Sequence, residues 1–188
     1  MKVAIKNMTL TAVFMAIGIV LPFFTGQIPQ VGNMMLPMHL PVLLCGLICG
    51  WQYGGLLGFI LPCLRFILFG MPPLFPIGIS MAFELAIYGI VIGLVFSLMK
   101  TKSIGTLYVS LIVAMLSGRI VWGIVRVIIG GVTQSAFTWE LFMAGAFLNA
   151  IPGIILQLIV IPSIMVILNK VGLMQVFRSS QSASQALR

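Results

Sequence analysis

The chain has 188 residues, of which 61% are hydrophobic and only 6% charged, and its mean hydropathy is +1.25. Soluble domains carry about 25% charged residues, so this composition excludes an ordinary soluble domain and predicts a membrane protein. The net charge of +8 does not indicate a nucleic-acid-binding protein, because the basic residues lie at the ends of apolar segments or inside them and form no solvated basic patch.

Apolar segments bounded by proline, glycine or charged residues predict an all-α membrane protein with six transmembrane helices in a compact bundle. The expected spans are 8–25, 38–50, 53–69, 75–99, 106–130 and 141–169. Lys2 and Lys6 precede the first span, which is long enough to cross and is expected to be retained rather than cleaved as a signal peptide. Residues 1–175 are expected to form one domain, and the polar residues 176–188 a disordered cytoplasmic tail.

The lysines and arginines of the loops predict the orientation, because such residues are retained on the cytoplasmic side. They precede span one, separate spans four and five, and follow span six: Lys2, Lys6, Lys100, Lys102, Lys170, Arg178 and Arg188. The opposite loops, at about 26–37, 70–74 and 131–140, contain neither residue type. Both termini are therefore predicted to be cytoplasmic.

Spans two and three meet at the short sequence Trp51-Gln52-Tyr53, which predicts a tight helical hairpin. Glycines recur at intervals of four through both spans, at Gly46, Gly50, Gly54 and Gly58. Small residues at this spacing let helices approach closely, so close packing is the expected role.

The first outer loop, 26–37, is long for a connection between neighbouring helices and mixes amides such as Asn33 with apolar residues. Loops of this kind often cover binding sites, although a plain connector has the same composition. The sequence leaves both alternatives open.

Span five contains Arg119, Trp122 and Arg126 in an otherwise almost wholly apolar segment. Positions i, i+3 and i+7 share one helix face, so the three side chains are expected to point the same way. The predicted orientation places Arg126 near the outer surface and Arg119 near mid-depth. An arginine within a bilayer is costly enough to indicate a function, with an anionic partner nearby.

Other polar residues are expected on spans two, three, four and six, most of them in the outer half of the bundle and Gln157 deeper: His39, Arg65, Ser80, Glu84, Tyr88, Asn149 and Gln157. A few oriented polar groups on an apolar wall are typical of a site for a small polar ligand. The surplus of arginine over Glu84 favours a carboxylate or phosphate.

A purely structural role is the alternative for several of these residues. Arg65 with Glu84, and Arg119 or Arg126 with Glu140, would make ion pairs between helices, although two pairs leave one arginine for a ligand. Trp122 alone is more typical of packing. For His39, a hydrogen bond to a local backbone carbonyl is the structural alternative.

The motifs of hydrolases, metalloproteases and nucleotide-binding proteins are missing, so the chain is not expected to be an enzyme. Cys45, Cys49 and Cys63 lie in apolar segments without ligands at metal-binding spacing, and neither a metal nor a cofactor is expected. Active transport would therefore need an ion gradient or a separate ATPase.

Three segments carry a resemblance to a known family: 36–50, 68–76 with the following 81–84, and the small-xxx-small pair Ala12 and Ala16. Over most of residues 8–170 the chain resembles the S components of energy-coupling factor (ECF) transporters, six-helix membrane proteins that capture vitamins for bacteria and archaea. The small-xxx-small pair is a weak motif by itself, since such pairs are common in membrane helices.

The resemblance implies a substrate-binding subunit in the bacterial cell membrane. It implies docking through Ala12 and Ala16 onto a membrane-embedded coupling (T) subunit that carries two cytoplasmic ATPases. ATP use by these subunits would drive the S component to topple in the membrane. Ordinary packing within the bundle is the alternative role for the two alanines. It also implies a ligand site in the outer half, closed by the first outer loop.

The chain looks closest to the pantothenate-type members, with biotin, lipoate, another small acid or cobalamin as alternatives. Arg126 and Arg119 are expected to bind the carboxylate, Trp122 to form an apolar wall, and Glu84 to orient an arginine or accept from a ligand hydroxyl. The polar groups of pantothenate would suit Ser80, Asn149, Gln157 and the loop amides. Two other classes of protein are the alternatives: a stand-alone carrier or channel, and a purely structural membrane subunit.

Overall fold

The computed structural model describes residues 2–25, 36–133, 138–146 and 148–171, and every regular element in these ranges is helical. The α-helices are α1 (Lys2–Val20), α3 (His39–Cys49), α4 (Trp51–Phe69), α5 (Ile79–Leu98), α6 (Ile104–Thr133), α7 (Trp139–Ala146) and α8 (Ile151–Lys170). Shorter helical turns are η1 (Leu21–Thr25), η2 (Leu74–Gly78) and η3 (Leu148–Ala150). The prediction of an all-helical fold is confirmed for the described residues.

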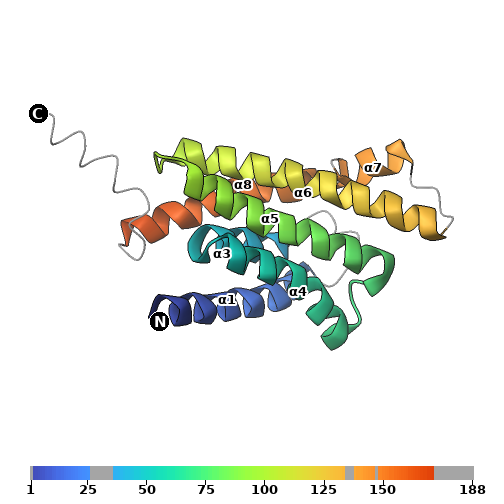
Figure 1. The fold of residues 1–188 in the computed structure, drawn as a ribbon, viewed down its shortest axis with the longest axis horizontal. Helices are drawn as coiled ribbons and strands as arrows, with labels where there is room; N and C mark the ends of the chain where they lie inside the picture. Colours follow the sequence, from blue (N-terminus) through green and yellow to red (C-terminus); the bar gives the residue numbers. More distant parts are fainter. Residues whose placement is uncertain (1, 26–35, 134–137, 147, 172–188) are drawn as a thin grey trace, which may run out of the picture.

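Helix α3 lies at the centre of the bundle, with α1 on one side and α5 on the other (Figure 1). It is apolar on all sides, as expected of a helix with no solvent- or lipid-facing stripe. All of its 11 residues except Leu40 and Ile48 are buried. The hydrophobic core forms around α3 and includes buried residues of α4, α5, α6 and α8.

Glycines bring α3, α4 and α5 into backbone contact. A Cβ atom at Gly58 would lie 2.2 Å from the carbonyl oxygen of Leu85, and one at Gly89 would lie 2.2 Å from the carbonyl group of Gly54. The predicted packing role is confirmed for Gly46, Gly54 and Gly58, since an added Cβ at each would overlap backbone atoms of a neighbouring helix. Gly50 differs: it joins α3 to α4 with φ of 100°, a conformation that favours glycine.

By length and composition, five segments are suited to cross a membrane, the last of which includes residue 147 outside the described residues: Ala4–Phe24, Trp51–Phe69, Leu74–Leu98, Ile104–Thr133 and Trp139–Lys170. Helix α3 is apolar but has only 11 residues, fewer than the roughly 20 that span the hydrocarbon core. The multi-pass prediction is therefore supported, whereas six full crossings remain a prediction, as does the orientation.

The last expected span, 141–169, is divided in the structure into α7, η3 and α8. Proline lacks a backbone N–H and disfavours helical conformation in the residue before it. Pro152 accordingly lies in the first turn of α8, where proline is tolerated. The division places Asn149 in a short turn between two helices.

Candidate functional site

A buried polar cluster lies where α3, α5 and α6 meet. Arg119 Nη1 lies 2.9 Å from Glu84 Oε1, and His39 Nε2 lies 3.4 Å from the same oxygen. All three side chains are at most 5% exposed. A buried carboxylate needs hydrogen-bond donors that compensate for its lost hydration. Here His39 of α3 and Arg119 of α6 supply them to Glu84 of α5.

Close packing behind the cluster sets the rotation of α5 and α6. A Cβ atom at Gly118 would lie 3.0 Å from two ring carbons of Tyr88 and 3.2 Å from the carbonyl oxygen of Glu84. The Tyr88 ring in turn meets the His39 ring edge-on, with centroids 5.1 Å apart. Gly118 therefore lets α5 approach α6 closely enough for Glu84 to reach Arg119.

The cluster forms part of the wall of a cavity of about 210 Å³. Its lining comes from Leu36 and from six described elements, which are α3, η2, α5, α6, α7 and η3: Leu36, His39, Ile77, Met81, Glu84, Arg119, Trp122, Arg126, Gly145 and Asn149. Two guanidinium groups thus face one carboxylate, beside apolar groups and an amide. Such a mixture suits a small polar molecule.

The structure brings together six residues that the sequence singles out: His39, Glu84, Arg119, Trp122, Arg126 and Asn149. The three on α6 share one face, as their spacing predicts, and the guanidinium carbon of Arg126 lies 5.9 Å from the centre of the Trp122 ring. Arg119 is the arginine that pairs with Glu84. Its Nε and Nη2 atoms are buried without a hydrogen-bond partner among the described residues.

Three other candidates lie outside the cavity lining. Arg65 Nη1 donates to the backbone carbonyl of Ile19, at 2.8 Å, instead of pairing with Glu84. The Ser80 hydroxyl donates to the carbonyl of Pro76, at 2.8 Å. Gln157 is fully buried, and its amide nitrogen and oxygen have no partner in the described parts of the chain. Asn33 lies outside the described residues.

Sequence reasoning did not single out Leu36, Ile77, Met81 or Gly145 as lining residues. Met81 begins one of the segments that carry the family resemblance, but its type gives no signal for a cavity. Gly145 gives none either, because its contribution is the space left by a missing side chain. Only the packing of α7 on α6 reveals it.

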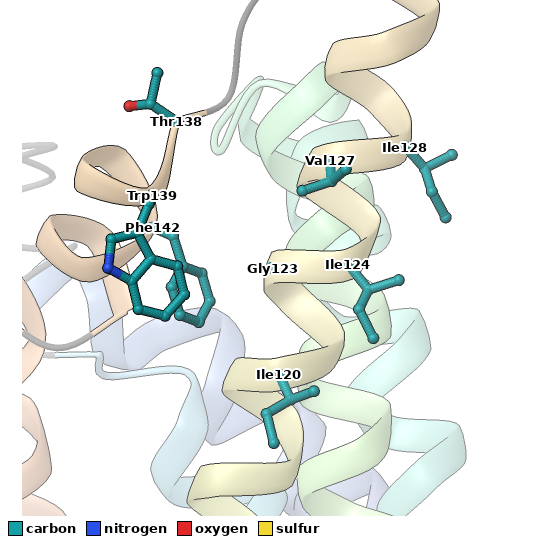
Figure 2. Close-up of a pocket in the computed structure, with 8 residues that line it drawn as sticks. All are labelled: Ile120, Gly123, Ile124, Val127, Ile128, Thr138, Trp139 and Phe142. Carbon is teal, nitrogen blue, oxygen red and sulfur yellow. The ribbon is translucent and has the colours of Figure 1, made fainter.

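A second cavity, of about 530 Å³, lies over the outward face of α6 beside α7 (Figure 2). Its lining is apolar apart from Thr138, and the rings of Trp139 and Phe142 form one side. None of the described residues that line it is charged. This cavity therefore offers nothing to neutralise an anionic ligand, in contrast to the one that contains Arg119 and Arg126.

Helix α1 presents Ala12 and Ala16 on its exposed face, next to Val13 and Ile17, which are 49% and 40% exposed. Neither alanine is buried within this chain. The opposite side of α1 packs against α3 and α4.

A model of the family described as "ECF transporter, substrate-specific component" matches residues 6–165, which is most of the chain. Searches of curated proteins and of solved structures find no match. The matched region contains every helix of the bundle apart from the first residues of α1 and the last of α8. The chain belongs to the family of substrate-specific components of ECF transporters.

Proposed function

We propose that this chain captures a small carboxylate vitamin, with pantothenate as the first candidate, in the cavity between α3, α5, α6 and α7. Membership of the family makes the chain a transport subunit that binds substrate and works with a coupling subunit and ATPases, rather than an enzyme. The observation that carries the proposal is the lining of the cavity, in which Arg119 and Arg126 outnumber Glu84.

The two arginines have different roles in this proposal. Glu84 holds Arg119 through Nη1, which leaves the buried Nε and Nη2 of Arg119 to donate to an oxygen of the ligand. Arg126, beside Trp122, binds the carboxylate. A guanidinium group suits this task because it presents paired donors in a planar arrangement that matches a carboxylate.

The composition of the remaining lining supports pantothenate as the ligand. Ile77, Met81 and Trp122 offer apolar surface to its dimethyl group, while Asn149 offers an amide to its hydroxyl and amide groups. A cavity of about 210 Å³ favours a small acid such as pantothenate over the far larger cobalamin. Biotin and lipoate carry the same carboxylate and are the competing ligands in the test.

Transport itself is proposed to follow the family's mode, in which the coupling subunit and ATPases make the S component topple. The exposed apolar face of α1 around Ala12 and Ala16 supports docking there, because neither alanine contributes to this chain's own core.

The first prediction compares pantothenate with pantothenol, its alcohol analogue without the carboxylate. Arg126→Ala should weaken pantothenate binding to the purified protein by at least about 10-fold, because hydrogen bonds to charged groups contribute about 1.5–3 kcal/mol. The same substitution should change pantothenol affinity less than threefold, and Arg126→Lys should recover part of the loss. Isothermal titration calorimetry measures all three.

Equal losses for pantothenate and pantothenol would remove Arg126 from carboxylate recognition. Wild-type protein that binds biotin or lipoate but not pantothenate would replace the ligand while keeping the role of the arginines.

A further inference from the structure

We propose that Gly145 is a specificity-determining residue: its missing side chain provides the space in which the Trp122 ring rests, and that position sets the width of the cavity. The inference rests on the proposed function, because it concerns the same cavity. Helix α7 thereby helps to set the width of the cavity, a role that neither the charge pattern nor the family membership indicates.

The indole of Trp122 lies directly over Gly145. A Cβ atom at position 145 would lie 2.7 Å from Trp122 Cη2, and 3.5 and 3.6 Å from Cζ2 and Cζ3. All three atoms belong to the six-membered ring of the indole. Since ordinary van der Waals contact begins at 3.4 Å, an added methyl group would force a displacement of about 0.7 Å.

A second contact between a glycine and an aromatic ring also joins α7 to α6. Here the glycine is on α6 and the ring on α7: a Cβ atom at Gly123 would lie 2.4 Å from Phe142 Cε2. Figure 2 shows the Phe142 ring beside Gly123, with the Trp139 ring next to it, and the two ring centres are 5.2 Å apart. Trp122 and Phe142 are also neighbours, with centres 6.2 Å apart.

The two contacts restrict how an added methyl group at position 145 can be accommodated. The indole is rigid, with the Arg126 guanidinium at 5.9 Å and Phe142 beside it. Either Trp122 turns away from α7, or α7 moves away from α6. Trp122 and Gly145 both line the cavity, so both movements change the same wall.

A methyl group at position 145 should therefore change which ligands fit. We expect displacement of the indole towards the cavity, so a larger acid should lose more affinity than a smaller one with the same carboxylate. Gly131 provides a matched control for glycine-to-alanine substitution, because it also lies on a helix and a Cβ atom there would meet no atom of the described residues within 4 Å.

The experiment measures binding of pantothenate and of the shorter acid pantoate to full-length purified protein. Gly145→Ala should lower the affinity for pantothenate at least tenfold more than that for pantoate, whereas Gly131→Ala should change neither affinity more than twofold. In protein that already carries Trp122→Phe, which removes the overlapping ring atoms, Gly145→Ala should change the ratio of the two affinities less than twofold.

A second measurement does not depend on the ligand. With Trp51 and Trp139 replaced by phenylalanine, the remaining emission comes from Trp122. Gly145→Ala should shift that spectrum, and Gly131→Ala should not. Identical spectra for the two variants would overturn the proposed contact, whichever ligand the protein binds.

The outcomes separate this inference from the proposed function. Equal losses for the two acids, or the same affinity ratio change with and without Trp122→Phe, overturn the role of Gly145 but leave acid binding by Arg126 intact. If the wild-type protein binds neither acid, the proposed ligand is rejected. The comparison of emission spectra then decides alone whether Gly145 contacts Trp122.

Discussion

Arg65 and Arg119 are each about 4% exposed, yet their guanidinium groups have different kinds of partner. Arg119 pairs with the carboxylate of Glu84 in the cavity wall. Arg65 donates to the backbone carbonyl of Ile19, near the end of α1, with the rings of Phe23 and Phe69 at 5.4 and 5.8 Å. The surroundings of Arg65 indicate a structural role in joining α4 to α1.

Replacement of Arg65 provides a second prediction. Arg65→Met keeps most of the side-chain volume but removes the donor to Ile19, and a hydrogen bond that involves a charged group contributes about 1.5–3 kcal/mol. The variant should unfold at a lower temperature than wild type while keeping its ligand affinity within a factor of two, because Arg65 does not line the cavity. Thermal unfolding and calorimetric titration of the same preparation measure both quantities. A large loss of affinity with unchanged stability would return Arg65 to the binding site.

At the scale of single residues, the sequence predicts side chains on one helix better than pairs across helices. Arg119, Trp122 and Arg126 share a face because of helix geometry alone, whatever surrounds them. The partner of Glu84 depends on how α4, α5 and α6 are rotated about their axes. That rotation is set by contacts such as Gly118 against Tyr88, which the sequence does not reveal.

The helices α4 and α5 illustrate the scale of elements, because glycines determine how closely they pack. Gly58 lies so near the backbone of Leu85 that a methyl group has no space without separating the two helices. Glu84 is the residue before Leu85, so the position of the cavity depends on this packing. The interval of four between glycines predicts the close approach, but it does not predict which neighbouring helix is approached.

A third prediction follows for Gly58. Gly58→Ala should lower the midpoint of thermal unfolding by roughly 2–12 °C, because overpacking costs about 1–3 kcal/mol and each kcal/mol shifts the midpoint by about 2–4 °C in a chain of this size. Gly131→Ala is again the control, with an expected shift below 2 °C. A midpoint for Gly58→Ala equal to that of the control would show that α4 and α5 accommodate the methyl group without strain.

Two elements differ from the expected pattern for physical reasons. Helix α3 is short because Gly50 turns the chain into α4 after 11 residues, and most residues of α3 are buried. The last span is divided at η3, and Pro152 lies directly after this turn, at the start of α8. Hydropathy detects apolar length, but a short break between two apolar helices leaves the average almost unchanged.

The orientation in the membrane belongs to the scale of the whole molecule, and it determines from which side a ligand enters. The loop between α5 and α6 carries Lys100 and Lys102, of which Lys102 donates to the carbonyls of Phe96 and Ser97 at the end of α5. The segment between α6 and α7 has no lysine or arginine. Charge asymmetry of this kind predicts that the loop between α5 and α6 is cytoplasmic.

Cysteine labelling in intact cells tests this orientation. Cys45, Cys49 and Cys63 are first replaced by alanine, and one cysteine is then introduced by Thr138→Cys or Ser103→Cys, at positions that are exposed in the structure. A membrane-impermeant maleimide should label the cysteine at 138 in intact cells and the one at 103 only after permeabilisation. The reverse pattern would place the opening of the cavity on the cytoplasmic side and contradict capture from outside.

The burial of the cluster where α3 begins also affects how the molecule responds to dissolved ions. Counterions screen charges that they can approach, and exposed pairs more than a Debye length apart, about 8 Å at physiological ionic strength, interact little. Arg119 and Glu84 are 2.9 Å apart and at most 5% exposed, so mobile ions have little access to either charge. The attraction that positions Arg119 is therefore expected to depend only weakly on the ionic strength of the surrounding solution.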